Sequence, residues 1–376
     1  MRAIETLEKQ HPITHAAVEA FQHGRSFPIV EERTVTFVFR GEAQAVQLVH
    51  WIHGLESAQP FQRLPGTDLW YFCMDLPRKS RVEYKLAISR GPHRQLIRDP
   101  LNPAFARDPF GANSVVHSAG YDAPDWIGED SEARRGELRS MRITGQSLGE
   151  REVQVYLPAR FRTTRRYPLL IAHDGRDYAE FASLKTVLDN LIHRLELPPL
   201  IAVLTNAGDR MREYAADPRH SDFLVNDVIP QLEAAYPLVR DPAARGLLGA
   251  SFGAVASLST AWRHPGQFGR LMLQSGSFAF TDIGKHDMGA IWDPVVEFVN
   301  EFRRRPGKPS DRVYLSCGVY EGLIYFNRSL VPLLQDTGME VRFREANDGH
   351  NWENWRDRLR EGLSWLFPGP LWMVYE

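Results

Sequence analysis

The stretch GLLGASFGAVASL at residues 246–258 places a serine, Ser251, between glycines, with small apolar residues on both sides. The pattern G-x-S-x-G is typical of a sharp turn from a buried strand into a helix, which lifts the serine hydroxyl out of the sheet. Glycine and serine are common enough for the pattern to arise by chance in roughly one chain in ten of this length. A serine that merely caps a core helix is the alternative interpretation. The surrounding sequence has to decide between the two.

From about residue 147 the sequence alternates apolar strands with helical stretches. Such strands, interleaved with helices, predict a mostly parallel sheet that helices cover on both faces. Ser251 lies where this alternation requires a nucleophile, because residues 245–248 end a buried strand and residues 254–262 begin a helix. The predicted strands are EVQVYLP (152–158), YPLLIAHDG (167–175), PLIAVLTN (199–206), RGLLGAS (245–251), RLMLQSGS (270–277), RVYLSCG (312–318) and MEVRFRE (339–345).

The N-terminal third has a different pattern. Short stretches rich in β-branched and aromatic residues alternate with clusters of Gly, Pro, Asp and Ser, which is the spacing of a β-sandwich. The proline-rich segment at residues 98–114 is interpreted as a closing loop. The predicted strands are RTVTFVF (33–39), AVQLVHWI (45–52), LWYFCMDL (69–76) and RVEYKLAI (81–88).

These patterns divide the chain into four segments. Residues 1–30 form a short helical lead, residues 31–120 a β-sandwich, residues 121–146 a polar linker, and residues 147–376 the α/β domain that holds Ser251. A chain of 376 residues is longer than a domain with a single hydrophobic core usually is, so its length is consistent with two domains. We expect the sandwich to narrow the choice of substrate and not to supply the chemistry.

The composition indicates an ordinary globular protein. The formal net charge of -2 points neither to nucleic acid nor to an anionic membrane surface as a partner. Cys73 and Cys317 lack any C-x-x-C spacing, so neither a disulfide framework nor a zinc site is indicated. No apolar run reaches the roughly 18 residues that span a bilayer, and the N-terminus lacks the apolar core of a signal peptide. We interpret the protein as soluble and cytoplasmic, with its oligomeric state left open.

A serine nucleophile needs a histidine base further along the chain. Three histidines follow Ser251. His264 ends a helix and suits a C-terminal cap, and His286 lies in a loop with no strand immediately before it. His350 follows the last predicted strand, beside Gly349, and a helix resumes after it. We therefore predict that His350 is the base.

The imidazole in turn needs a carboxylate that holds its tautomer. Glu321 is the first choice, because it stands just beyond the strand at residues 313–317 and so at the same sheet edge as Ser251. Asp282 and Asp287 remain alternatives. Asp348 is too near His350 in sequence to reach it from another strand end, although it is placed to orient the loop.

Two backbone N–H groups are expected to stabilise the oxyanion. One belongs to Phe252, the residue after the nucleophile, and the other to Gly175 or Arg176 in the loop of LLIAHDGRDY. Asp174 is interpreted as a brace for that loop. No H-E-x-x-H or other paired-ligand spacing occurs, so we predict neither a metal nor a cofactor.

At these residues the chain resembles the enterochelin esterase family, within the esterase D group of α/β-hydrolases. The resemblance covers nearly everything from about residue 30 onward. The strand-to-helix turn at Ser251 is named here the elbow. In the family two glycines usually follow the elbow serine motif, and this chain departs from that pattern because Ala254 replaces the second glycine. The matching stretches are RDPLNP (98–103), YPLLIAHDG (167–175), RMREY (210–214), SDFLVNDVIPQLEAAYP (221–237), RGLLGASFGAVASL (245–258), FGRLMLQSGSF (268–278), CGVYEG (317–322) and DGHNWENWRDRL (348–359).

The resemblance implies an immunoglobulin-like β-sandwich before an α/β-hydrolase domain, and a triad of Ser251, Glu321 and His350. It also implies cytoplasmic hydrolysis of a ferric tris-catecholate lactone, which releases iron. Arg210 and Arg212 are candidates for binding such an anionic ester, since their loop follows a strand end, but solvation or pairing with acidic neighbours is an equal alternative. Two other functions remain open: an esterase or acyltransferase for another ester, such as a sugar-linked acyl group, and a non-catalytic binding protein on a hydrolase scaffold.

Overall fold

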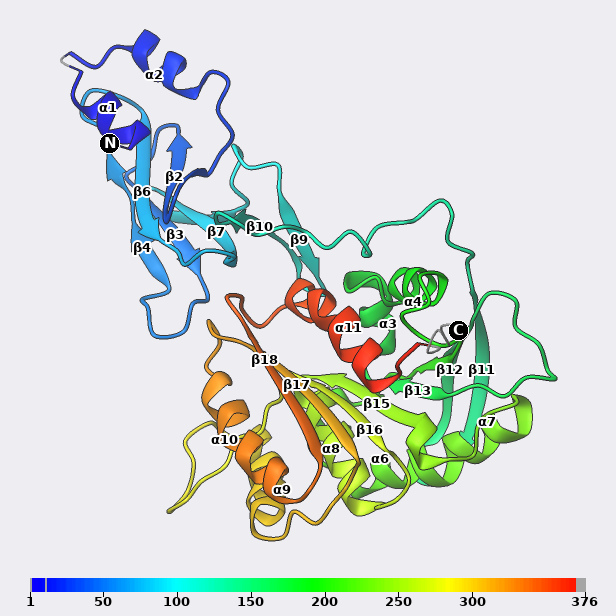
Figure 1. Ribbon diagram of the computed structural model, residues 1–376. Coiled ribbons are helices and arrows are strands. Elements are labelled where there is room, and N and C mark those ends of the chain that lie inside the picture. Colours follow the sequence, from blue (N-terminus) through cyan, green and yellow to red (C-terminus); the bar gives the residue numbers. More distant parts are fainter. Residues whose placement is uncertain (1, 11, 370–376) are drawn as a thin grey trace. The chain divides into compact units, whose positions relative to one another are not determined.

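The computed structural model describes residues 2–10 and 12–369, and Figure 1 labels its elements. The chain divides into two compact units. One, named here the N-terminal unit, consists of Met1–Ala123, Gly318–Gly322 and Ala346–Asn351. The other, the C-terminal unit, consists of Pro124–Cys317, Leu323–Glu345 and Trp352–Glu376. Two short segments from late in the chain therefore pack with its N-terminal third.

Two antiparallel sheets share one apolar core in the N-terminal unit. Phe37 of one sheet meets Tyr84 of the other edge to face, with ring centroids 4.9 Å apart. The helices α1 (Ala3–Glu8) and α2 (His15–Gln22) precede them. The first sheet has the order β1 (Ile29–Glu31), β2 (Thr34–Arg40), β6 (Leu69–Asp75), β5 (Gln62–Arg63). The second has the order β4 (Ala58–Pro60), β3 (Ala45–His50), β7 (Arg81–Arg90), β10 (Gly111–His117), β9 (Phe105–Asp108), with β8 (His93–Ile97) also paired to β7.

The closing loop predicted at residues 98–114 is wrong in its second part. Strands β9 and β10 pair there as a hairpin, with Gly111 opposite Asp108, and β10 continues the sheet beside β7. The turn residues that suggested a loop lie between and before two short strands. Only the tertiary pairing with β7 makes the segment part of a sheet, which explains why its local composition concealed it.

The C-terminal unit is built on one eight-stranded sheet. The strands β14, β13, β15, β16 and β17 run parallel, and β12 is antiparallel to β14. The predicted, mostly parallel sheet is thus confirmed. Its order is β11 (Glu137–Gly145), β12 (Gly149–Leu157), β14 (Ile201–Leu204), β13 (Leu169–Ala172), β15 (Arg245–Ala250), β16 (Arg270–Gln274), β17 (Arg312–Gly318), β18 (Glu340–Ala346).

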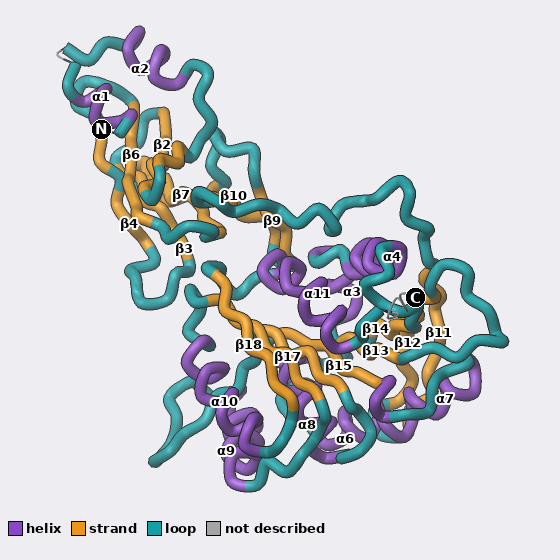
Figure 2. The backbone as a smooth tube through the Cα atoms, viewed as in Figure 1, coloured by secondary structure: helices purple, strands orange, loops and turns teal. Residues whose placement is uncertain are grey.

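Helices cover both faces of this sheet (Figures 1 and 2). Successive side chains of β13 point to opposite faces of the sheet. Leu169 and Ile171 pack in the core on one face, and Leu170 and Ala172 pack in the core on the other. One layer contains α3 (Gly175–Phe181), α4 (Leu184–His193) and α11 (Trp352–Leu366). The helices that supply the other core are η1 (Phe223–Val228), α7 (Ile229–Ala235), α8 (Phe252–Arg263), α9 (Asp293–Arg304) and α10 (Ile324–Asp336). The short elements are α5 (Arg210–Glu213), α6 (Pro218–Asp222), η2 (Pro242–Ala244) and η3 (Ala290–Trp292).

The segment predicted as a linker, residues 121–146, ends in a strand. Residues 137–145 form β11, which pairs antiparallel with β12 along its whole length. Most side chains of β11 are exposed, and of its nine residues only Ile143 is buried. Because most side chains of this edge strand face solvent, its sequence carries no apolar pattern and resembles that of a polar linker. The prediction of a linker is therefore wrong for these residues.

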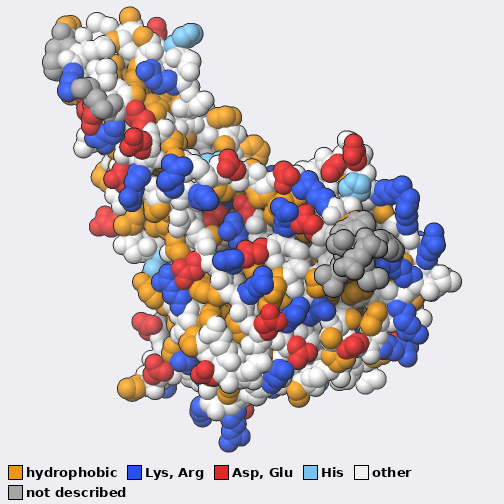
Figure 3. All heavy atoms as spheres, viewed as in Figure 1, with side chains coloured by type: hydrophobic (Ala, Val, Ile, Leu, Met, Phe, Trp, Pro, Cys, Tyr) orange, Lys and Arg blue, Asp and Glu red, His pale blue; other side chains and the backbone are white. Residues whose placement is uncertain are grey.

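The surface carries mixed charge. On the face drawn in Figure 3, Lys and Arg side chains are interspersed with Asp and Glu side chains. No helix within the described ranges combines the length and the apolar composition that crossing a bilayer requires.

Candidate active site

Ser251 occupies a strained turn between β15 and α8. Its backbone has φ 57° and ψ -122°, a conformation that L residues other than glycine rarely adopt. The Ser251 N–H donates to the Gln274 carbonyl at 2.9 Å, which ties the turn to β16. Strain of this kind costs about 1–3 kcal/mol and persists only where the surroundings enforce it. The turn is the strand-to-helix elbow that the sequence predicts.

Close packing explains both glycines of the G-x-S-x-G pattern. A Cβ atom on Gly249 would lie 2.1 Å from the Gly253 carbonyl oxygen, and one on Gly253 would lie 3.3 Å from His173 Cβ. The first contact is impossible, whereas the second requires a small shift. Ala254, which replaces the second glycine of the family pattern, is fully buried in the core.

The Ser251 hydroxyl is half-buried and lies beside a second hydroxyl. Its Oγ is 3.2 Å from the Oγ of Ser277, which is buried after β16. The Ser277 N–H also donates to the Ser251 carbonyl, at 3.2 Å. Ser277 thus holds the elbow from the side of β16.

The predicted oxyanion donors differ in what they already bind. Phe252 is the first residue of α8, so its N–H has no acceptor within the helix. The Gly175 N–H donates to the Thr205 carbonyl at 2.8 Å and is therefore occupied, which contradicts its predicted role. The Arg176 N–H donates to the exposed side-chain oxygen of Asn206 at 3.2 Å. Of the two candidate oxyanion donors in this loop, only the Arg176 N–H binds a side chain. Rotation of the Asn206 side chain would free this N–H for the oxyanion.

Gly175 has a packing role instead. A Cβ atom there would lie 2.4 Å from Leu204 Cα, so only glycine lets α3 begin against β14. The preceding residue, Asp174, has a left-handed φ of 50°.

Arg210 is a structural partner of Asp174. Its Nε and Nη2 atoms donate to the buried Asp174 carboxylate at 2.7–3.0 Å. This ion pair agrees with the alternative that Arg210 pairs with an acidic neighbour, and it gives the predicted bracing role of Asp174 a partner. Substrate binding by Arg210 stays a prediction. Arg212, by contrast, has an exposed side chain, and its N–H donates at 3.2 Å to the side chain of Asp209, which caps the N-terminus of the short helix α5.

Glu321 and His350 form a close pair in the N-terminal unit. His350 Nδ1 lies 2.6 Å from Glu321 Oε2, and Glu321 Oε1 accepts the Gly318 N–H at 2.7 Å. The Glu321 carboxylate is buried, whereas 37% of the His350 side chain is exposed. With Nδ1 engaged by the carboxylate, proton exchange with a substrate or nucleophile has to take place at Nε2.

The alternative acids and bases occupy other surroundings. Asp282 and Asp287 are exposed loop residues, whereas Glu321 is the carboxylate that contacts the His350 ring. His264 is the C-cap of α8, as predicted, and His286 Nε2 pairs with Asp293 at 2.9 Å.

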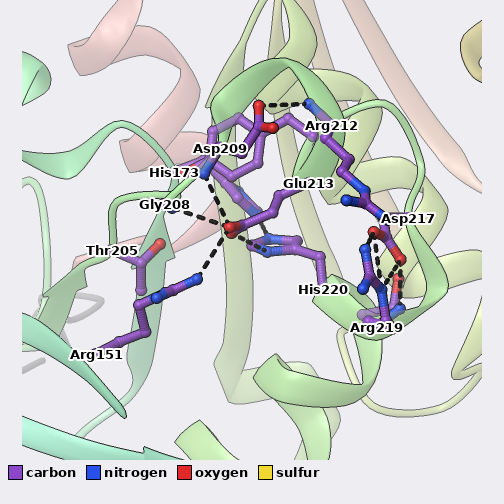
Figure 4. Close-up of polar contacts among 12 residues, drawn as sticks. Arg151, His173, Thr205, Gly208, Asp209, Arg212, Glu213, Asp217, Arg219 and His220 are labelled. Carbon is purple, nitrogen blue, oxygen red and sulfur yellow. Dashed lines mark hydrogen bonds and ion pairs between the residues drawn. The ribbon is translucent and has the colours of Figure 1, made fainter. Parts of the chain in front are cut away.

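A buried polar network under the elbow was not predicted. The Nε2 atoms of His173 and His220 lie 3.0 Å apart (Figure 4). His173 Nδ1 lies 3.0 Å from Ser257 Oγ of α8. Burial lowers the pKa of His173 to about 4 and that of His220 well below its ordinary value. Both imidazoles are therefore neutral at pH 7 and act as hydrogen-bonding groups.

Glu213 is the carboxylate of this network. Its Oε1 accepts from Arg151 Nη2 at 3.1 Å and from the Gly208 and Asp209 N–H groups at 3.0 Å (Figure 4). His220 Nδ1 lies 3.9 Å from Glu213 Oε2. His173 lies 47 residues from His220, and Arg151 lies 62 residues from Glu213, so no local motif reveals these two contacts. In the described ranges, no three His, Cys, Asp or Glu side chains are grouped to hold a metal ion.

Comparison with known proteins gives this arrangement a family context. The family model described as "Putative esterase" matches residues 144–366, and that described as "Enterochelin esterase, N-terminal" matches residues 34–126. The chain is 27% identical over 345 residues to the iron(III) enterobactin esterase of Escherichia coli O6:H1 (strain CFT073), with 82% of each chain covered. It is 26% identical over 366 residues to that of Dickeya dadantii (strain 3937), covering 84% of this chain and 81% of the relative.

Solved structures resemble the fold. The ferric enterobactin esterase from Salmonella typhimurium has a TM-score of 0.77 and 22% identity, with 93% of this chain and 98% of that chain covered. The Shigella flexneri enterobactin esterase, solved in the presence of enterobactin, has a TM-score of 0.73 and 22% identity, covering 93% and 97%. A ferulic acid esterase, with a TM-score of 0.55 and 21% identity, covers 63% of this chain but 98% of its own. The two enterobactin esterases share with this chain an α/β-hydrolase domain and the β-rich domain before it.

Proposed function

Because this chain belongs to the enterochelin esterase family and is a carboxylic ester hydrolase, we propose that it hydrolyses the ester bonds of a ferric catecholate siderophore of the enterobactin type and so releases iron. The ferric ion is cargo of the substrate. One observation carries the choice of substrate: similarity to the iron(III) enterobactin esterases extends through both units, whereas the ferulic acid esterase has no counterpart for about a third of this chain.

Ser251 is the proposed nucleophile. Its Oγ attacks the ester carbonyl carbon while its proton passes to His350 Nε2, and Glu321 stabilises the resulting imidazolium through Nδ1. The ester C–O bond then breaks, the leaving alkoxide takes the proton from Nε2, and an acyl-enzyme remains. Water then gives a proton to Nε2 and attacks the acyl carbon. The bond between the acyl carbon and Ser251 Oγ breaks, the carboxylic acid is released, and Oγ takes the proton back from Nε2. The elbow strain at Ser251 and the 2.6 Å contact between Glu321 and His350 support these roles.

Phe252 is the proposed first oxyanion donor, and Arg176 the second. The N-terminus of α8 adds partial positive charge where the tetrahedral intermediate becomes negative. For Arg176 to serve, the Asn206 side chain must release its N–H, and this exchange is part of the proposal.

Arg212 is proposed to contact the anionic substrate. It is exposed and follows β14, a strand of the parallel sheet whose carboxyl edge is where ligands bind in such folds. Arginine suits catecholate oxygens because its guanidinium donates in a planar fork.

The N-terminal unit is proposed to be an immunoglobulin-like sandwich, which the two antiparallel sheets around one core support. We place the reaction in the cytoplasm, as the family resemblance implies.

The test is a product assay with the purified protein. Ferric enterobactin is incubated with the wild type and with the S251A variant, and chromatography with mass spectrometry follows the loss of the lactone and the appearance of linear catecholoyl-serine products. We expect turnover by the wild type and none by S251A. Feruloyl esters and acetylated sugars serve as competing substrates. Rapid turnover of one of these, with the catecholate lactone left intact, would overturn the assignment.

A further inference from the structure

Arg81 at the start of β7 is a fully buried charge that reaches the loop of His350. Its Nη1 atom donates to Asn351 Oδ1 at 2.9 Å and lies 3.3 Å from Asp348 Oδ1. Its Nη2 atom donates to Glu83 Oε1 at 2.9 Å. The two residues that the guanidinium holds through Nη1 flank His350 on either side in the chain.

The His350 loop is organised around this contact. Asp348 Oδ1 also accepts the Gly349 N–H at 2.7 Å and Asn351 Nδ2 at 2.8 Å. The Arg81 N–H donates to the Asn347 carbonyl at 2.9 Å. The backbone and the side chain of Arg81 therefore hydrogen-bond to both ends of the loop at residues 347–351, which carries His350.

The loop of Glu321 is held by neighbouring residues of the same unit. The Ser80 Oγ and Tyr320 hydroxyl groups lie 2.6 Å apart, and the His53 N–H donates to the Tyr320 carbonyl at 2.7 Å. The loop around Tyr320 precedes Glu321 directly. Both members of the Glu321–His350 pair are thus attached to strands and loops of the N-terminal β-rich fold.

We propose that Arg81 is a positioning residue for His350, so that the N-terminal domain contributes to the chemical step and not only to the choice of substrate. The inference rests on the proposed role of His350 as the base. The physical reason is the rigid, planar guanidinium. Its Nη1 donates to Asp348 and Asn351 while its Nη2 is held by Glu83, an orientation that a flexible lysine ammonium does not reproduce. Without the guanidinium, the buried Asp348 carboxylate loses its charged partner and Asn351 Oδ1 loses a donor, so the loop has to move to recover these hydrogen bonds.

The test compares R81K and R81M with the wild type on p-nitrophenyl acetate, whose small acyl group makes no demand on a siderophore site. A misplacement of about 1 Å costs on the order of 100-fold in rate, so we expect kcat to fall about 10- to 100-fold with KM nearly unchanged. The downfield proton resonance of the His350 Nδ1–H in contact with Glu321 should shift or broaden in the same variants. R81K, which keeps the charge, should fold and still fail to recover kcat.

R245M is the matched control. Arg245 is also buried and ion-paired, with Glu233 at 2.7 Å, but it begins β15 at the opposite end of that strand from Ser251. We expect R245M to lower the melting temperature and leave kcat within about twofold, since loss of a buried pair alone acts on stability. Equal effects of R81K and R245M on kcat would overturn the proposal.

A double-mutant cycle keeps the proposal testable if R81M does not fold. D348N preserves the shape of its side chain but weakens the contact with Arg81. R81K and D348N should each lower kcat, and the double variant should be little worse than the more damaging single one, because both act through one contact. Additive losses, or a kcat for R81K within twofold of the wild type, would refute it. Failure of the wild type on the siderophore, with p-nitrophenyl acetate still hydrolysed, would remove the proposed substrate and leave this test intact.

Discussion

Glu321 and His350, 29 residues apart in the chain, are joined by a 2.6 Å contact between Oε2 and Nδ1. The other carboxylate oxygen accepts the Gly318 N–H at 2.7 Å, so both oxygens are fixed while the carboxylate is almost fully buried. A charge held in this way orients the imidazole and keeps one tautomer. The pair supports the predictions for Glu321 and Ser251 below.

The E321Q variant should lose most of its activity. The amide preserves the shape of the side chain but removes the negative charge and favours the wrong tautomer of His350, which costs on the order of 10³- to 10⁴-fold in kcat. Steady-state hydrolysis of p-nitrophenyl acetate measures this. D282N and D287N are the controls and should stay within about twofold of the wild type, because both residues are exposed. A greater loss in either control than in E321Q would move the acid to that residue.

Ser251 should be the residue that an organofluorophosphonate labels. The wild type should gain the mass of one phosphonyl group, and S251A should gain none while it retains the wild-type circular dichroism spectrum. S277A, which removes the neighbouring hydroxyl at 3.2 Å, should still be labelled. Labelling of S251A at comparable rates would show that the activated nucleophile lies elsewhere.

The G249A variant should fail to fold stably. Its methyl group would lie 2.1 Å from the Gly253 carbonyl oxygen, a backbone atom that cannot move without opening the elbow. We expect a loss of about 3 kcal/mol or more in the free energy of unfolding, as for other severe overpacking. G128A is the control, since no atom lies within 4 Å of a Cβ atom at that position. Urea denaturation of both variants measures the difference, and equal stabilities would contradict the close approach.

The protein should lose stability as the pH falls from 7 to 5. The pKa of His173 is lowered by burial from an ordinary 6.5 to about 4, and that of His220 is also lowered. Between pH 6.5 and 4 the unfolded chain therefore binds more protons than the folded one, and the stability present above pH 6.5 declines. His173 alone accounts for about 2 kcal/mol between pH 7 and 5.

Thermal unfolding at the two pH values measures this decline. H220Q should reduce the difference in melting temperature, because it removes one of the two buried imidazoles. H193Q is the control, since His193 is exposed, and should leave the difference unchanged. The same pH dependence in H220Q and the wild type would exclude the buried pair as its source.

The R212Q variant should bind an anionic catecholate lactone less tightly. Loss of an exposed charge that contacts substrate raises KM for that ester, with kcat and the hydrolysis of a neutral small ester little changed. The effect should shrink as ionic strength rises, because salt screens exposed charges. R210M should instead lower the melting temperature, since Arg210 pairs with buried Asp174. An unchanged KM in R212Q at low salt would remove Arg212 from the substrate site.

Local constraints in the sequence were enough to predict the elbow and the alternation around it. Gly249 and Gly253 are needed by packing within a few residues of Ser251, so the motif carries its own structural requirement. The parallel strands are apolar along their length because helices cover both faces of the sheet, and that pattern is visible without coordinates. The edge strand β11 lacks such a pattern, since most of its side chains are exposed, and it was predicted as a linker.

The sequence by itself determined the class of turn, the alternation of apolar strands and helices around Ser251, and a short set of candidate acids and bases. These follow from steric rules and hydrophobic periodicity that act over a few residues. Only the tertiary structure decided that Glu321 and not Asp282 or Asp287 contacts His350, that Arg210 is held by Asp174, and that Arg81 reaches Asp348 from 267 residues away. Hydrogen bonds and ion pairs depend on distances between distant parts of the chain, and those distances exist only once the sheets have packed.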